Sequence, residues 1–209
     1  MTTRDAFLAR VRAQLGTDAD VGTGSVAVPE PAYVRDLADP VVAFTEAAQG
    51  SGAIVRRIVT DDDLRDLLEE TGARTVVRTR DPETAAVLPL LSSVGMGEAA
   101  FDSPGAAAAA DLGIAGGAWG IAATGSVVID AGRAGGRSAS LLPPGVLFLV
   151  ARDRILTTAA VLFRRLGEHY PEGLPSQLVL VTGPSRTADI ELVLTVGVHG
   201  PGRVWIAIV

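Results

Sequence analysis

The alternation of apolar runs and helix-start signals between residues 53 and 92 limits what this chain can fold into more than any other feature. Ala53 to Val59 and Arg74 to Thr79 are short runs rich in β-branched residues, a composition typical of strands. A helix start follows each run, at Thr60 with three aspartates behind it and at Asp81-Pro82. The order strand, helix, strand, helix predicts a parallel sheet with helices packed against it.

The second half of the chain continues this pattern. A helix is expected from Thr157 or Thr158 to about Gly167, because a hydroxyl residue there precedes an apolar repeat. Further strand-like runs lie at 127–130, 146–151, 178–182 and 204–209.

The length of the chain predicts a single domain. With 209 residues, 48% of them hydrophobic, it can fill one core and is too short for two. We expect this α/β domain to span residues 39–209. Residues 1–38 are expected to form an N-terminal arm, with a helix to about Leu15 and then a linker rich in glycine and proline.

The sequence contains no cysteine and no lysine. Without cysteine the chain has no thiolate for an iron-sulfur cluster, so we expect no cofactor here and place any such cluster on a partner protein. Without lysine it can form neither a Schiff base nor the usual P-loop. The two histidines, His169 and His199, are too far apart for a metal-binding motif, so no metal ion is expected.

Charge and hydropathy limit the possible partners. A net charge of -6 argues against nucleic acid and anionic membranes, because both favour a basic face. The most apolar stretch, residues 114–129, is shorter than a membrane span, and the N-terminus lacks the apolar segment of a signal peptide. These features predict a cytoplasmic protein.

The segment TGPSRTADIELVLTVGVHGPGR, residues 182–203, is the densest group of chemically capable side chains. Ser185 follows Gly183-Pro184 and is a good N-cap, so a helix is expected to start there. Such an N-terminus would make Ser185, Arg186 and Thr187 an anion-binding site.

Two residues of this segment are candidate proton acceptors for a substrate hydroxyl, His199 and Asp189. A purely structural role explains these residues equally well. In that case Ser185 and Asp189 cap the helix, Arg186 pairs with a nearby carboxylate, and His199 hydrogen-bonds within its turn.

Two further segments supply candidate ligand-binding residues. Thr124, Gly125 and Ser126 place two hydroxyls beside a glycine at the start of a strand, which suits an anionic or carbonyl ligand or an ordinary turn. Arg137 lies in the glycine-rich loop GRAGGRSASLLPP, which is able to close on a carboxylate or phosphate. A solvated loop tip is an equally good interpretation.

The segment TGPSRTADIELVLTVGVHGPGR, together with GIAATGSVVID and GRSASLLPP, resembles the LUD domain family, and within it the lactate-utilization C proteins. The resemblance covers residues 112 to 209. It implies a three-layer α/β fold like that of the sugar-phosphate isomerases and CoA transferases. It also implies a part in oxidising L-lactate to pyruvate with two partner proteins, at least one of which carries iron-sulfur clusters.

One departure from the family bears on catalysis. The family often has acidic residues where this chain has Ala118 and Ala123, so a carboxylate base at those positions is missing. Two other functions therefore stay open. One is a free-standing enzyme acting on a phosphorylated or CoA-linked small molecule, and the other is a non-catalytic assembly or regulatory protein that docks through its N-terminal helix.

Overall fold

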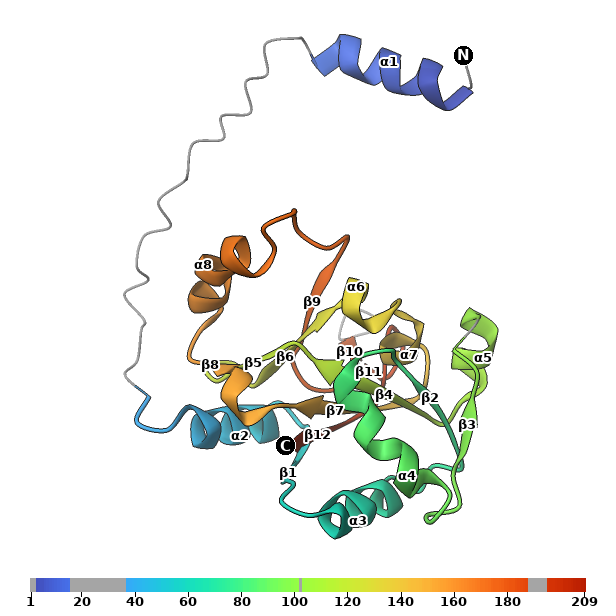
Figure 1. The fold of residues 1–209 in the computed structure, drawn as a ribbon, viewed down its shortest axis with the longest axis vertical. Coiled ribbons are helices and arrows are strands. Elements are labelled where there is room, and N and C mark those ends of the chain that lie inside the picture. The colour runs from blue at the N-terminus through green and yellow to red at the C-terminus, as the bar shows by residue number, and fades with distance from the viewer. Residues whose placement is uncertain (1–2, 16–36, 102, 188–194) are drawn as a thin grey trace.

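The computed structural model describes residues 3–15, 37–101, 103–187 and 195–209, and a six-stranded parallel sheet lies at its centre (Figure 1). The strand order is β1-β12-β7-β4-β2-β3, and every neighbouring pair is parallel. The strands are β1 (Ile54–Arg57), β12 (Arg203–Ile208), β7 (Gly145–Val150), β4 (Leu112–Gly117), β2 (Thr75–Arg78) and β3 (Gly97–Ala99). The α/β fold with a mostly parallel sheet, expected from the sequence, is confirmed.

Both faces of this sheet are buried, which explains the uninterrupted apolar sequence of its central strand. On β7, Val146, Phe148 and Val150 belong to one hydrophobic cluster, and Leu147 and Leu149 belong to another. The second cluster is completed by the helices α3 (Asp61–Thr71) and α4 (Leu88–Leu91) and by the 3-10 helix η1 (Pro82–Val87).

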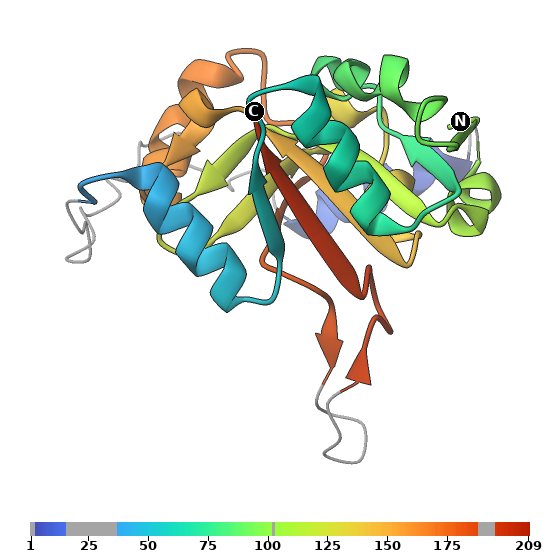
Figure 2. The same cartoon turned by 90° about the horizontal axis from the view of Figure 1, so that it is seen from below.

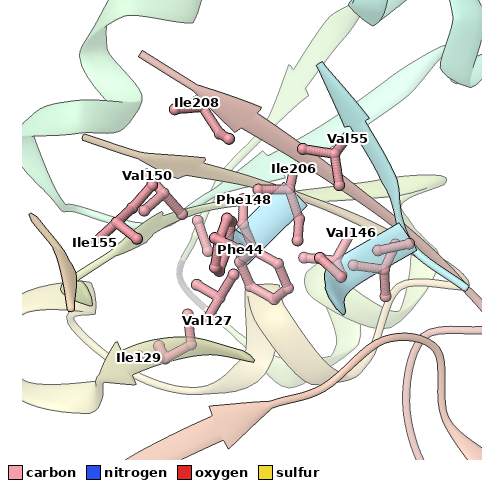
Figure 3. Close-up of a cluster of buried hydrophobic side chains, with 14 of the residues drawn as sticks. Phe44, Val55, Val127, Ile129, Val146, Phe148, Val150, Ile155, Ile206 and Ile208 are labelled. Atoms are coloured by element: carbon pink, nitrogen blue, oxygen red, sulfur yellow. The ribbon is translucent and has the colours of Figure 1, made fainter. Parts of the chain in front are cut away.

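The first cluster joins the parallel sheet to helix α2 (Pro40–Gly50) and to a second sheet (Figure 3). Phe44 of α2 is fully buried there against residues of both sheets. The second sheet has the order β8-β5-β6-β9. Its strands are β8 (Ile155–Leu156), β5 (Trp119–Ile121), β6 (Ser126–Asp130) and β9 (Leu178–Val181).

Helix α8 (Ala159–His169) covers the other face of the second sheet through Leu162, which belongs to one cluster with Trp119, Ile121 and Val128. Within this sheet β6 pairs antiparallel with β5 and β9, and β5 pairs parallel with β8. The strands expected at 127–130 and 178–182 are β6 and β9, but the sequence did not predict that they form a sheet of their own.

Short elements connect these layers. They are α5 (Pro104–Ala109), α6 (Ala131–Ala134), α7 (Ser138–Leu141) and the 3-10 helix η2 (Arg152–Arg154). The N-terminal helix α1 (Thr3–Leu15) lies outside the two sheets (Figure 1). None of the helices among the described residues has both the length and the hydropathy that crossing a bilayer requires.

The helix predicted from Asp81 to about Ser92 is interrupted. It consists of the 3-10 helix η1 followed by the short α-helix α4. Pro89 has no N–H to donate to the carbonyl of Ala85, so a continuous α-helical ladder cannot pass through this point.

Candidate functional site

Some of the predicted site residues come together beside the C-terminal end of α2. The hydroxyl of Ser126 is 2.7 Å from the hydroxyl of Thr124 and 2.7 Å from that of Thr182. Ser126 is buried, whereas Thr124 and Thr182 are exposed, so the chain of three hydroxyls leads from the interior to the surface. We call Thr124, Ser126, Thr182 and the neighbouring Arg186 the α2 surface.

Two glycines bring the loops of the α2 surface close to α2. Gly125 has φ +64°, and a Cβ atom there would overlap the backbone nitrogen of Ala48. A Cβ on Gly183 would overlap the carbonyl oxygen of Ser51. The guanidinium of Arg186 occupies the space beside Gly52, the next residue along. Because α2 ends here, its carbonyls bring partial negative charge to this surface.

The prediction of a helix starting at Ser185 is wrong for the residues that directly follow Ser185. Arg186–Thr187 is strand β10, which pairs antiparallel with β11 (Thr195–Val196), and Figure 2 shows the two strands projecting from the body of the protein. The backbone of Ser185 is held by Pro201 and Gly197, since its N–H donates to the first and its carbonyl accepts from the second. Long-range pairing therefore overrides the local capping signal, and Ser185 and Arg186 do not begin a helix at the α2 surface.

The remaining predicted residues do not join this group. His199 is exposed in the bend after β11. Arg137 donates a hydrogen bond of 2.8 Å to Oε1 of Gln177. Gln177 precedes Leu178, which pairs with Asp130 at the end of β6. Arg137 therefore lies at the opposite end of β6 from Ser126. Asp189 lies outside the described residues.

A second polar region lies at the topological switch point of the parallel sheet. From β2 the chain continues to β3 on one side, whereas from β4 the later strands β7 and β12 are added on the other side. In open parallel sheets, ligands bind outside the carboxyl ends of the strands at such a point.

Asp81 joins the carboxyl ends of β2 and β4 at this point. It is 3% exposed, and its Oδ2 accepts hydrogen bonds from the Thr79 hydroxyl (2.6 Å) and the Gly116 N–H (3.3 Å). Gly116 leaves the necessary space, because a Cβ there would lie 2.6 Å from the Cβ of Asp81. Burial raises the pKa of Asp81, although the two hydrogen bonds and the charge of Arg133 act in the opposite direction.

Asp81→Asn is expected to leave the protein at least as stable as the wild type at pH 7. Folding raises the pKa of Asp81, so the protonated carboxyl stabilises the folded state. This stabilisation is complete below the pKa of Asp81 in the unfolded chain, about 4, and is lost as the pH rises through its pKa in the folded protein. Asparagine does not ionise, and its side-chain oxygen can still accept from Thr79 and Gly116. Urea unfolding at pH 4 and pH 7 measures this, and a variant equally destabilised at both values contradicts it.

Glu83 and Arg133 form an ion pair next to Asp81, with 2.6 Å between Oε1 and Nη2. Their side chains are 16% and 25% exposed, so water screens the pair only partly. Burial alone would raise the pKa of Glu83, but the hydrogen bonds from its own backbone N–H and from Arg133 outweigh it, and the pKa is lowered. The pair links η1 to α6.

Asp130 extends this network to α8. Its Oδ1 caps α6 by accepting from the N–H groups of Gly132 (2.7 Å) and Arg133 (3.3 Å), and its Oδ2 accepts from the Tyr170 hydroxyl (2.6 Å). Burial and the neighbouring Asp130 carboxylate raise the pKa of Tyr170, which keeps the hydroxyl a donor. We call Asp81, Glu83, Arg133, Asp130 and Tyr170 the carboxyl-edge network.

His169 lies against this network through aromatic contacts. Its ring centroid is 4.7 Å from that of Trp119 and 4.9 Å from that of Tyr170, both at edge-to-face angles. The ring therefore packs with the other two at the end of α8.

The carboxyl-edge network was missed in the sequence because its members lie far apart along the chain. The sequence did show Asp81 directly after a buried strand, but that position also suits a helix start. Only the strand order, which no local pattern reveals, places it beside Gly116.

A family model described as the LUD domain matches residues 42–209. Among curated proteins, the uncharacterized protein YkgG of Escherichia coli (strain K12) is 40% identical over 94 residues, 44% of this chain and 41% of the relative. Lactate utilization protein C of Halalkalibacterium halodurans is 38% identical over 96 residues, 45% of this chain and 42% of the relative. The protein of the same name from Macrococcus caseolyticus is 43% identical over 84 residues, 39% of this chain and 36% of the relative.

The fold is similar to one solved by crystallography. A DUF162 family protein from Deinococcus radiodurans superposes with a TM-score of 0.58 at 22% identity, covering 81% of this chain and 95% of that one. The match to each curated relative quoted above spans less than half of that relative's length. The LUD model, in contrast, covers nearly all of the α/β body, and the chain belongs to the LUD domain family.

Proposed function

We propose that this chain serves lactate utilization as a subunit that binds a small anionic ligand and does not carry electrons. The observation that carries the proposal is the LUD match over residues 42–209, together with relatives named lactate utilization protein C at 38% and 43% identity. Oxidation of lactate to pyruvate removes two electrons and two protons. With no cysteine in its 209 residues, the chain offers no thiolate to a cluster that would accept the electrons.

The partners in this proposal are iron-sulfur proteins that take up those electrons. Purification of the native complex under anaerobic conditions, followed by lactate-dependent dye reduction with and without this chain, tests the proposal. Omission is expected to lower the rate of the complex, and the chain alone is expected to reduce no dye. An unchanged rate on omission contradicts a role in the reaction and leaves only an assembly or regulatory role.

The α2 surface is the proposed place for the small anion. The side chain of Arg186 makes no hydrogen bond or ion pair with any described residue, and it lies beside Gly52, just after the end of α2. Thr124 and Thr182 are exposed residues whose loops pack against the same end of α2. Since the end of α2 contributes partial negative charge, Arg186 has to supply the positive charge that holds an anion here.

Arg186→Ala is therefore expected to weaken binding of lactate or phosphate to the α2 surface at least about tenfold, because a charge-assisted hydrogen bond is lost. Calorimetric titration of the purified protein measures the change. Arg164→Ala on the exposed part of α8 removes the same charge and serves as the control. If Arg186→Ala binds both anions like the wild type while Arg164→Ala does too, the anion does not bind at this surface.

An alternative function is a free-standing enzyme acting on a phosphorylated or CoA-linked small molecule. The position of Asp81 favours it, because a buried carboxyl with a raised pKa at the switch point of a parallel sheet is typical of a proton-transfer site. Turnover of such a substrate by the purified chain, abolished in Asp81→Asn, would support this alternative.

A further inference from the structure

A cleft of about 370 Å³ lies at the carboxyl ends of β2 and β3, beside the switch point. Its volume is at the lower end of the range for ligand pockets, roughly 300–1,000 Å³, and suits a small molecule. Its lining residues are Arg78, Thr79, Arg80, Glu98, Ala99, Ala100 and Phe101.

The two arginines of this cleft differ in whether their side chains have a partner within the protein. The guanidinium of Arg78 is held by Oε1 of Glu98 (3.0 Å) and the Thr84 hydroxyl (3.0 Å). Arg80, in contrast, is exposed, and its side chain makes no hydrogen bond or ion pair with any residue in the described ranges. With two arginines and one glutamate, the lining carries a net charge of about +1, and the free positive charge is that of Arg80.

Two glycines fix the position of Arg80 relative to Phe101. The backbone N–H of Arg80 donates to the carbonyl of Ala134 (3.0 Å), and a Cβ on Gly135 would lie 2.9 Å from Cδ of Arg80. A Cβ on the next residue, Gly136, would lie 3.2 Å from Cζ of Phe101. The glycine pair after α6 therefore lets the cationic and the aromatic side chain pack against the same turn.

We propose that this cleft binds a small organic monocarboxylate, with Arg80 as the carboxylate-binding residue and Phe101 with Ala99 and Ala100 against the hydrocarbon part. The planar guanidinium matches a carboxylate with two parallel hydrogen bonds. The single unused positive charge and the nearby carboxylate of Glu98 disfavour a doubly charged phosphate. This inference is independent of the proposed function and of the α2 surface.

Titration of the purified chain with formate, propionate, benzoate and inorganic phosphate tests the proposal, with calorimetry or chemical-shift changes as the readout. Propionate and benzoate are expected to bind more tightly than formate, since only they present carbon to Phe101. Arg80→Ala is expected to weaken binding of every carboxylate at least about tenfold. Arg80→Lys keeps the charge but not the fork, so its loss is expected to be intermediate.

Three controls make the outcome decisive. Arg164→Ala lowers the net charge equally on α8 and is expected to bind like the wild type. Phe101→Ala is expected to reduce the preference for propionate over formate while formate binding persists. Arg186→Ala is expected to leave carboxylate binding at the cleft unchanged, which separates this site from the α2 surface. Undiminished carboxylate binding in Arg80→Ala overturns the proposal. Tighter binding of phosphate than of propionate in Arg186→Ala, where the anion-binding arginine of the α2 surface is removed, also overturns it.

Discussion

Gly113→Ala is expected to destabilise the protein by more than about 3 kcal/mol or to prevent folding altogether. Gly113 lies in the middle of the parallel sheet, in β4, and α7 crosses it with its backbone. A Cβ at this position would overlap the carbonyl oxygen of Ala139 and lie 2.9 Å from its carbonyl carbon. The clash joins the backbone of β4 to the backbone of α7, and neither can move aside as the end of a flexible side chain can. To make room for the methyl group, α7 has to move away from the sheet.

Urea unfolding followed by circular dichroism measures the effect, with Gly167→Ala as the matched control. Gly167 is exposed in α8, and a Cβ added there would meet no atom within 4 Å, so alanine is expected to stabilise the protein by about 0.5–1 kcal/mol. Glycine to alanine should thus lower the free energy of unfolding at position 113 and raise it at position 167. A Gly113→Ala midpoint equal to that of the wild type is incompatible with the packing of α7 on β4.

Asp130→Ala is expected to cost about 3 kcal/mol, the second-largest loss predicted for this chain. The cap of α6 contributes about 1 kcal/mol of this, and the Tyr170 hydroxyl left without an acceptor contributes about 1–3 kcal/mol. Asp130 is 3% exposed, so its carboxylate makes these interactions largely shielded from water.

A double-mutant cycle with Tyr170→Phe separates the two contributions. Tyr170→Phe alone is expected to cost about 1 kcal/mol, because it removes one hydrogen bond and leaves Asp130 with its cap. In the Asp130→Ala background the same change should cost nothing or restore some stability, since no acceptor remains. Strict additivity of the two substitutions would show that the Tyr170 to Asp130 hydrogen bond does not exist in solution.

The strands β1, β2, β7 and β12 of the parallel sheet were predictable because local signals indicate them. The runs at 53–59 and 74–79 and the capped start at Thr60 are all properties of neighbouring residues, and the Thr60 capping box is present in the structure. The second sheet was predicted only in part. Its strands β6 and β9 match the expected runs at 127–130 and 178–182. Strand β5 has three residues and β8 has two, too few to show a strand pattern.

In the candidate site, too, contacts between residues close in sequence were predictable and long-range contacts were not. The hydroxyls of Thr124 and Ser126 are close in sequence, and they do meet. The helix at Ser185 was wrong because Arg186 pairs with Val196, a contact that no capping rule includes. Asp81 lies beside β4 because of the strand order, and Arg80 packs against the turn at Gly135. Both contacts join residues that are far apart in the sequence, so no local pattern predicts them.

The position of β12 has a consequence for how the chain is made. Residues 203–208 occupy an interior place in the sheet, between β7 and β1, so that Ile54 finds its partner only at Trp205. During synthesis from the ribosome, β1 and α2 emerge long before the strand that joins them to the rest of the sheet. Until residues 203–208 have emerged, the edges of β1 and β7 that β12 covers lack their partner strand, so the native sheet forms only after that point.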